Sequence, residues 1–394
     1  MNTDLRTVRT AVVHKAGRAA ATLTRSNGTV TFAYLPEYAG PQVAHTLPLG
    51  TTLTMHGGAV PPFFAGLLPE GRRLTAVRRA AKTSADDDLT LLLIVGSDTV
   101  GDVTVFAEGA DTTAAGPAVT AAEIASVRFA DLLAESGFVD RRGLPGVQDK
   151  LSAGMITLPA RFAGMEAIIK LDPPDYPGAV ANEAYFLRVA RRLKQPVVDA
   201  EIVHDRDGRA ALLVRRFDRQ GGQPPKLAVE DASQLLGRYP ADKYAVSSEE
   251  VAGAIADACS ARPVAARAVF QQFALAWLTG NGDLHAKNIS VVQQPSGEWR
   301  VAPIYDVPST LPYGDRSMAL PLQGATEGLT RRRFVAFGTD LGLPERAIVS
   351  ALAEVLSATE AMLGELEAGV LPWNANLRRT VLRQLARRRR DMLP

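Results

Sequence analysis

The chain has 394 residues, of which 46% are hydrophobic, so it can bury a large core in two or three domains. Its 44 basic and 42 acidic residues leave a net charge of +2, so the overall charge gives no reason to expect that the chain binds nucleic acid or an acidic substrate. The single cysteine, Cys259, excludes an internal disulfide framework. The N-terminus is polar and no run of about 18 uncharged apolar residues occurs, so we expect a cytoplasmic protein with no membrane contact.

Residues 1–108 predict a β-rich N-terminal domain. Two strand-like runs within residues 18–34 flank an Asn-Gly pair, which is typical of a β-hairpin turn. Residues 61–71 predict a helix that begins at a proline and stops at a Pro/Gly pair, and residues 83–96 predict a helix with Asp and Ser caps. The small, polar residues of 107–121 predict a linker or a surface loop.

Residues 109–228 predict a second region in which strands surround one helix. Strands are expected at 151–158 and 166–171, where apolar residues dominate short runs. Residues 182–194 have the amphipathic pattern of a helix. An Asp-Gly pair further along the chain predicts a second hairpin.

Residues 229–394 predict a mainly helical domain, so the fold class is expected to be α+β. A strongly apolar helix is predicted at 269–280, and a glycine ends it. A loop, 281–288, follows this helix. Two strands are then expected on either side of a Pro-Ser-Gly turn, the second of them ending in Ile304-Tyr305-Asp306, and most of 327–394 is expected to be helical.

The most informative motif lies in the loop after the apolar helix. It places Asp283 and Asn288 five residues apart, which is the D-x-x-x-x-N spacing of protein-kinase catalytic loops. In such a loop the aspartate accepts the proton of the substrate hydroxyl and the asparagine holds a metal ion. Asp306, eighteen residues after Asn288, is expected to reach the same metal, because Mg²⁺ prefers oxygen ligands and usually takes only one or two carboxylates.

A kinase also needs a cation on the ATP phosphates and a carboxylate that holds the cation. Lys170 lies on a predicted strand, on the same face as Ile168. Glu183 lies on the apolar face of the following helix, and a core-facing glutamate is costly unless it is paired. We therefore expect Lys170 and Glu183 to form an ion pair.

Each of these residues alone also fits a purely structural role. Polar side chains on tight turns are often turn formers or caps, a strand lysine can extend to the surface, and a glutamate in a first helical turn can cap the helix together with Asn182. The order of strand lysine, helix glutamate, D-x-x-x-x-N and strand-end aspartate is less common by chance and favours phosphoryl transfer. The residues with these two interpretations are Lys170, Glu183, Asp283, His285, Asn288 and Asp306.

The sequence resembles the HipA family of bacterial toxin kinases over nearly the whole chain. The resemblance is strongest in segments that occur in the family's order: PGVQDKLSAG, IIKL, NEAYFLRVARRL, RRFDR, EDASQLLGRYPADKY, GNGDLHAKN and PIYDVPST. It implies a HipA-like protein kinase fold with a β-rich N-terminal domain and a mainly helical C-terminal kinase lobe. The implied activity is that of a serine/threonine protein kinase toxin that uses ATP and Mg²⁺, with aminoacyl-tRNA synthetases as the substrate class.

The resemblance also implies partners and site residues. A small helix-turn-helix antitoxin, HipB-like, would neutralise the toxin, and the complex would bind operator DNA mainly through the antitoxin. By family likeness Asp283 is catalytic, Asn288 and Asp306 bind the metal, and the region 109–228 binds ATP. The implied ATP-binding residues are Gly146, Val147, Gln148, Asp149 and Lys150 of a phosphate-binding loop, together with Lys170, Glu183, Phe217, His285 and Lys287.

One departure from the family concerns regulation. The family's inhibitory phosphoserine lies three residues before the loop glycine, and here that position is Gly143, which cannot accept phosphate. Either the switch is missing or another hydroxyl, such as that of Ser152, replaces it. Two other functions also fit the motifs: an inactive kinase-fold co-repressor or scaffold bound to a DNA-binding partner, and a small-molecule kinase with the same site.

Overall fold

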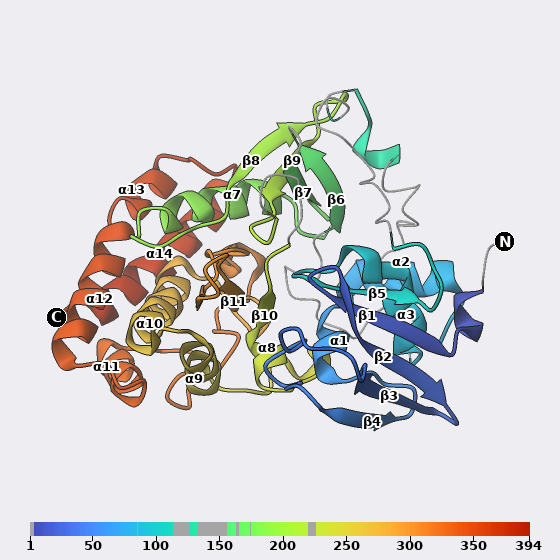
Figure 1. The fold of residues 1–394 in the computed structure, drawn as a ribbon. Coiled ribbons are helices and arrows are strands. Elements are labelled where there is room, and N and C mark those ends of the chain that lie inside the picture. Colours follow the sequence, from blue (N-terminus) through green and yellow to red (C-terminus); the bar gives the residue numbers. More distant parts are fainter. Residues whose placement is uncertain are drawn as a thin grey trace.

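The protein has an α+β fold, as the sequence predicts, and the computed structural model divides it into three bodies (Figure 1). An N-terminal β-sheet with three helices lies on one side, a helical body lies on the other, and a second sheet bridges them at one end. The structure describes residues 4–84, 86–112, 124, 126–131, 156–162, 165–173, 175–219 and 226–394.

The N-terminal body is built on a five-stranded antiparallel sheet in the order β4-β3-β2-β1-β5. The predicted hairpin is confirmed: Ser26 pairs with Thr29, and both Asn27 and Gly28 have positive φ, which the tight turn requires. Inward side chains alternate along β1 and β3 and form a separate core. The strands are β1 (Thr10–Lys15), β2 (Arg18–Ser26), β3 (Thr29–Tyr34), β4 (Thr52–His56) and β5 (Val103–Ala107).

Three helices cover this sheet, α1 (Pro62–Gly66), α2 (Gly71–Ala81) and α3 (Asp88–Val95). The first ends earlier than expected, and α2 was not predicted, because its sequence has few apolar residues. The third is capped as predicted by an aspartate, Asp87, whose side chain accepts a hydrogen bond from Thr90 N. The segment that joins α1 to α2 faces the helical body.

The second sheet is antiparallel, in the order β6-β7-β9-β8, and helix α7 packs against it. Its strands are β6 (Ile156–Phe162), β7 (Met165–Leu171), β8 (Ala200–His204) and β9 (Ala210–Arg215). The hairpin predicted at the Asp-Gly pair and the strand predicted at 166–171 are confirmed, whereas β6 shares only residues 156–158 with the strand expected at 151–158. Helix α7 (Ala179–Ala190) begins three residues before Asn182, at a left-handed Gly178. The interpretation of Asn182 and Glu183 as first-turn caps is therefore wrong.

The third body contains a short sheet, β10-β11-β12, surrounded by helices (Figure 1). Helix α10 is buried from Val269 to its end and stops at Gly280, whose φ of 73° closes it as predicted. The elements are β10 (Val229–Asp231), α8 (Ala232–Leu235), α9 (Ser248–Ala258), α10 (Arg262–Thr279), β11 (Ser290–Gln293), β12 (Trp299–Val301), α11 (Arg331–Asp340), α12 (Glu345–Ala358), α13 (Met362–Glu367) and α14 (Ala375–Met392). One-turn 3₁₀ helices occupy Leu5–Thr7, Gly96–Asp98, Pro240–Asp242 and Leu311–Tyr313.

Two details differ from the sequence prediction. Strand β12 ends at Val301, and Ile304 makes only an isolated parallel bridge to Val197, so Asp306 follows a bridge rather than a regular strand. The second concerns the segment Glu345–Glu367. Among the described residues, it is the one helical stretch whose length and composition would allow it to cross a membrane. It forms two helices, α12 and α13, and the apolar side of α12 packs into the main core. The composition of this stretch therefore has a sufficient explanation in core packing.

Candidate active site

A buried cluster of three charged residues joins the second sheet, α7 and the segment after β12. Lys170 Nζ lies 2.7 Å from Glu183 Oε1 and 2.8 Å from Asp306 Oδ1. Lys170 points away from the packed face of β7 because its neighbours Ile169 and Leu171 fill the core behind the sheet. The predicted Lys170–Glu183 pair is thus present, and Asp306 shares the same ammonium group. We call these three residues the Lys170 cluster.

Electrostatics in the Lys170 cluster reflect one ammonium group shared by two carboxylates. Burial by itself lowers the pKa of Lys170, but Asp306 and Glu183 outweigh it and raise the pKa above its usual range. Burial raises the pKa of Glu183 to about 7; Lys170 opposes this shift and the Asp306 carboxylate adds to it. The lysine is therefore charged at neutral pH, while Glu183 is close to its titration point.

The loop 281–288, which follows α10, holds Asp283 with its side chain fully buried. Tyr244 donates a hydrogen bond to Asp283 Oδ1 at 3.1 Å, and Asn288 Nδ2 donates to the Asp283 carbonyl at 2.9 Å. Burial raises the pKa of Tyr244, with Asp283 adding to the shift and Asp306 contributing more weakly, so Tyr244 remains a donor. The loop therefore closes on itself, and Tyr244 holds the Asp283 carboxylate from outside it.

The remaining predicted residues of this loop have different surroundings. His285 is buried, its Nδ1 accepts from Lys287 N at 3.2 Å, and its Nε2 is 4.0 Å from Asp283 Oδ1. Lys287 Nζ instead lies 2.7 Å from Asp231 Oδ2 and donates to Gly66 O at 2.9 Å. Lys287 therefore links the loop to the N-terminal body, and it also lines the cavity described next.

A cavity of about 300 Å³ opens beside the Lys170 cluster, within the usual size range of small-molecule sites. The cavity is lined by Lys170, Glu183 and Asp306 and also by Phe217, whose ring lies 5.8 Å from that of Tyr305. One wall comes from the N-terminal body. The apolar lining is formed by Leu67, Leu68, Pro69, Val95, Val100, Ile168, Val198, Val214, Phe217 and Val229.

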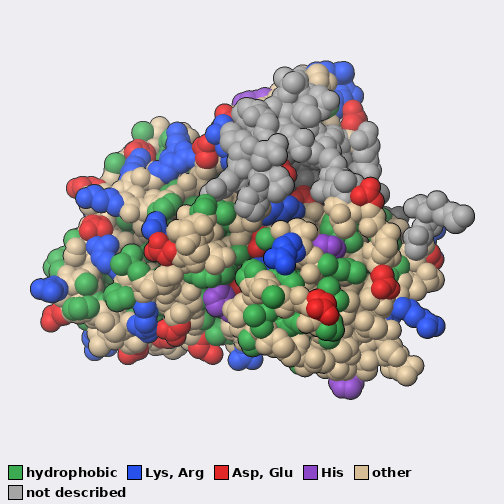
Figure 2. Space-filling model, viewed as in Figure 1, with side chains coloured by type: hydrophobic (Ala, Val, Ile, Leu, Met, Phe, Trp, Pro, Cys, Tyr) green, Lys and Arg blue, Asp and Glu red, His purple; other side chains and the backbone are tan. Residues whose placement is uncertain are grey.

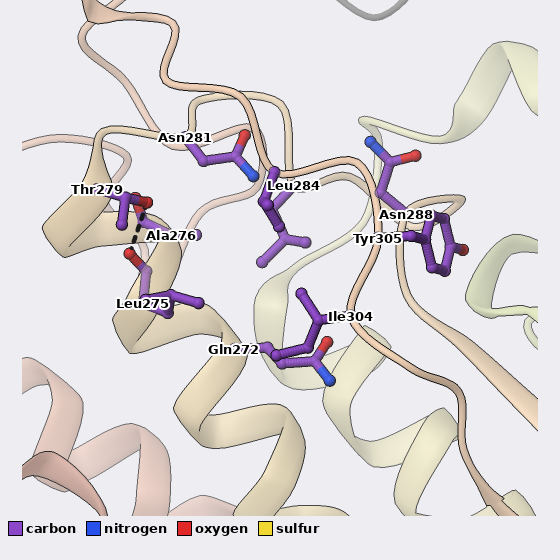
Figure 3. A pocket seen from close by; sticks show the side chains of 10 residues that line it. Gln272, Leu275, Ala276, Thr279, Asn281, Leu284, Asn288, Ile304 and Tyr305 are labelled. Atoms are coloured by element: carbon purple, nitrogen blue, oxygen red, sulfur yellow. Dashed lines mark hydrogen bonds between the residues drawn. The ribbon is translucent and has the colours of Figure 1, made fainter. Parts of the chain in front are cut away.

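The underside of the loop 281–288 is tightly packed. Figure 3 shows Leu284 and Ile304 pointing toward each other across a small cavity of about 10 Å³, while the amide of Asn288 points away from it. That space is about the size of one water molecule. The Thr279 hydroxyl, also in this view, donates to the Leu275 carbonyl of α10. The core therefore supports the loop from below, and the Asn288 amide faces the opposite side.

The donor set can be compared with the needs of a magnesium ion. Asn288 Nδ2 donates to the Asp283 carbonyl, which leaves Asn288 Oδ1 as the atom available to a cation. No described residue donates a hydrogen bond to Asn288 Oδ1. Asp306 supplies a carboxylate. Among the described residues no group of three or more His, Cys, Asp or Glu side chains could hold a metal alone. Two oxygen ligands fit Mg²⁺ that is bound together with nucleotide phosphates.

Figure 2 shows acidic and basic side chains interspersed over the visible face, in agreement with the net charge of +2. The predicted phosphate-binding residues 146–150, and Gly143 and Ser152, lie outside the described residues. Sequence reasoning did not single out Tyr244, Tyr305 or the wall from the N-terminal body, since their roles depend on contacts between distant segments.

Comparison with known proteins gives the family. Residues 11–106 match the HipA N-terminal domain and residues 143–363 match the HipA-like C-terminal domain. Two candidate kinases of Sinorhizobium fredii are similar over most of the chain: Y4dM is 29% identical over 93% of this chain and 93% of its own length, and Y4mE is 30% identical over 80% and 81%.

A third relative is the serine/threonine-protein kinase toxin HipA of Shewanella oneidensis, 28% identical over 84% of this chain and 82% of its own. The solved complex of Shewanella oneidensis HipA with HipB and its operator DNA contains a chain with the same fold, at a TM-score of 0.77, 22% identity and 96% coverage of both chains. With both of its domains matched in order, this chain belongs to the HipA family.

Proposed function

We propose that this protein is a serine/threonine protein kinase that transfers the γ-phosphate of Mg-ATP to a hydroxyl group of a cellular protein. The observation that carries the proposal is the Lys170 cluster, in which one ammonium group contacts both Glu183 and Asp306 beside a cavity of about 300 Å³. Kinases need this lysine–glutamate pair and a metal-binding aspartate in place together. The cluster is complete, which supports an active enzyme.

Each residue then has a defined task. Lys170, held by Glu183, would neutralise the phosphates, and the rings of Phe217 and Tyr305, which also line the cavity, would contact the adenine. Asn288 and Asp306 would hold Mg²⁺, which supplies charge neutralisation at the transferred phosphate. Asp283 accepts the proton of the acceptor hydroxyl. Most of the rate enhancement comes from positioning and electrostatic stabilisation, because the protein forms no covalent bond in phosphoryl transfer.

The biological setting is proposed from the family. The Shewanella oneidensis HipA was solved with HipB and operator DNA, so we propose that a small helix-turn-helix antitoxin neutralises this chain and that the complex binds operator DNA. An aminoacyl-tRNA synthetase is the proposed substrate class, and the cytoplasm the proposed location. We propose domain boundaries at 1–108, 109–228 and 229–394; the separate core of the N-terminal body supports the first boundary, whereas the main core is shared by the second and third regions.

A second candidate is an inactive co-repressor that binds a DNA-binding partner without transferring phosphate. The unbroken Lys170–Glu183 and Lys170–Asp306 contacts favour the active kinase, because nothing in a scaffold role requires them. A small-molecule kinase would have the same site, and only the identity of the acceptor separates it from a protein kinase.

The test is incubation of the purified protein with labelled ATP, Mg²⁺ and cell lysate. A labelled protein acceptor is expected with the wild type and not with Asp283→Ala, whose loss should be on the order of 10²-fold or more, as for a general base. Nucleotide binding without label transfer in the wild type would favour the co-repressor. Label confined to small molecules would favour a small-molecule kinase.

A further inference from the structure

Asn182 makes a reciprocal contact that the kinase mechanism described above does not use. Its Nδ2 donates to Ser309 O at 2.9 Å, and its Oδ1 accepts from Ser309 N at 2.8 Å. Both residues are fully buried. The side chain amide thus satisfies both backbone groups of one residue 127 positions away, and removing the amide would leave the buried N–H and C=O of Ser309 without these partners.

This contact completes a closed ring of interactions around the Lys170 cluster. Asn182 precedes Glu183 on α7, and Glu183 contacts Lys170 at 2.7 Å. Lys170 contacts Asp306 at 2.8 Å, and Asp306 lies three residues before Ser309, which returns to Asn182. Because every link is short, a shift of α7 relative to Asp306 has to break at least one of them.

The next residue, Thr310, connects the same segment to the loop that bears Asp283. Gly282 N donates to Thr310 Oγ1 at 3.0 Å, and Thr310 N donates to Gly280 O at 2.8 Å. The Ser309–Thr310 segment therefore touches α7 on one side and the loop 281–288 on the other. We call Asn182, Ser309 and Thr310 the junction.

The backbone at Asp306 shows why such a junction is needed. Asp306 has a φ of 54°, in the left-handed region that residues other than glycine rarely adopt. An unfavourable backbone conformation persists only where the surrounding structure over-determines it. Lys170 fixes the Asp306 side chain, and Asn182 fixes the backbone three residues further on.

We propose that Asn182 is a positioning residue, which sets the metal-binding Asp306 and the Lys170–Glu183 pair in register with Asp283. The proposal rests on the proposed kinase function. Asn182 itself reaches neither phosphate nor acceptor, since both functional groups of its amide are used by Ser309. Asn182 would therefore affect catalysis only through Asp306 and Glu183. Its contact with Ser309 is neutral and buried, and it holds α7 against the segment that follows Asp306.

The first measurement compares Asn182→Ala with a control, Gln271→Ala. Gln271 carries a buried amide on α10 whose Nε2 donates to Glu354 on α12, and it lines neither cavity described above, so Gln271→Ala should keep wild-type kcat. Asn182→Ala should lower kcat at saturating ATP by on the order of 10²-fold, the effect of a displacement of about 1 Å at a reacting centre.

The second measurement separates positioning from a general structural role. Calorimetry gives the enhancement of ATP affinity by Mg²⁺ for the wild type, Asn182→Ala, Lys170→Ala and the double variant. If Asn182 acts through the Lys170 cluster, each single variant loses much of the enhancement and the double variant loses no more than Lys170→Ala alone. Additive losses, or a lower melting temperature with kcat and the Mg²⁺ enhancement unchanged, would overturn the proposal.

A second variant covers the case in which Asn182→Ala does not fold. Thr310→Val keeps the volume but removes the contact with Gly282 N, so it should lower kcat while the Mg²⁺ enhancement stays at the wild-type level. An unchanged kcat in Thr310→Val would contradict the junction. If the wild type itself transfers no phosphate, the proposed function fails, and the Mg²⁺ titrations still test the role of Asn182 separately.

Discussion

At the residue scale, Asp306 and Asp283 have different tasks that separate variants can distinguish. Asp306 is one of two proposed protein ligands for Mg²⁺, whereas Asp283 acts on the acceptor hydroxyl. Asp306→Ala should therefore lose the Mg²⁺ enhancement of ATP affinity, and Asp283→Ala should retain most of it. Calorimetric titration of ATP with and without Mg²⁺ measures both; full enhancement in Asp306→Ala would remove it from the metal site.

The titration of Glu183 predicts a pH dependence of nucleotide binding. Because burial raises the pKa of Glu183 to about 7, its carboxylate gains a proton as the pH falls from about 8 to about 6. The protonated group no longer attracts Lys170 as an ion, so ATP affinity should weaken toward low pH. In Glu183→Gln this part of the dependence should disappear, while the ionisation of ATP itself affects both proteins equally. Parallel pH profiles for the two proteins would contradict the role of Glu183.

At the element scale, the loop 281–288 depends on close approach of its backbone to the segment after Asp306. A Cβ on Gly282 would lie 2.5 Å from Ser317 O and 2.6 Å from Thr310 Oγ1, both of which are fixed by hydrogen bonds or backbone. Gly282→Ala should displace Asp283 and lower kcat by on the order of 10²-fold. Gly253→Ala, in α9 with open space at its Cβ, is the control and should leave kcat unchanged.

The C-terminal helix α14 ends in a run of four arginines, at 387–390. Arg388 is buried: it donates to Trp277 O at the end of α10 and to Arg316 O, and its guanidinium lies 3.9 Å from the Trp277 ring. Burial lowers the pKa of Arg388 to about 10, and Asp315 opposes that shift. Arg389 donates to Leu356 O. Two of the four arginines at 387–390 therefore hold α14 against the rest of the helical body.

We therefore expect Arg388→Met to lower the free energy of unfolding by about 2–4 kcal/mol, the sum expected for hydrogen bonds to a charged group and a desolvated cation–π contact. Urea unfolding measures this change. Arg387→Gln is the matched control, because that side chain is 67% exposed and should change stability little. Equal stabilities for the two variants would mean that Arg388 does not anchor α14. A contact of α14 with DNA is best tested on Arg387 and Arg390 alone, by the salt dependence of operator binding.

At the scale of the whole molecule, hydrogen bonds and ion pairs connect the N-terminal body to the helical body. His45 Nδ1 lies 2.7 Å from Glu230 Oε1, and Gln234 Nε2 donates to Phe63 O at 3.0 Å. Lys243 forms an ion pair with Glu70, and Lys287 donates to Gly66 O. The same interface supplies one wall of the cavity, so we expect the two bodies to unfold together.

Urea unfolding can test this cooperativity with two probes. All three tryptophans, Trp277, Trp299 and Trp373, lie in residues 229–394, whereas circular dichroism also reports the N-terminal sheet. Coincident transitions from fluorescence and circular dichroism are expected for a single cooperative unit. An early transition seen only by circular dichroism would show that the N-terminal body unfolds independently.

The sequence determined the local elements and supplied the candidate site residues that these elements carry. The hairpins, the apolar helix α10 and its glycine stop follow from local backbone preferences and hydrophobic period, which act within a few residues. The pairing of Lys170 with Glu183 could be predicted from the sequence, because a buried charge on an apolar helix face requires a partner.

Only the tertiary structure decided how these elements meet. The contact of Asn182 with Ser309 spans 127 residues, and nothing in the local pattern of either residue indicates it. The cavity wall from residues 67–69, the burial of Arg388 and the pairing of Lys287 with Asp231 likewise depend on packing between distant segments. The sequence specifies the chemistry of each side chain. The partners of that side chain depend on which surfaces the fold brings together, and those surfaces come from distant parts of the chain.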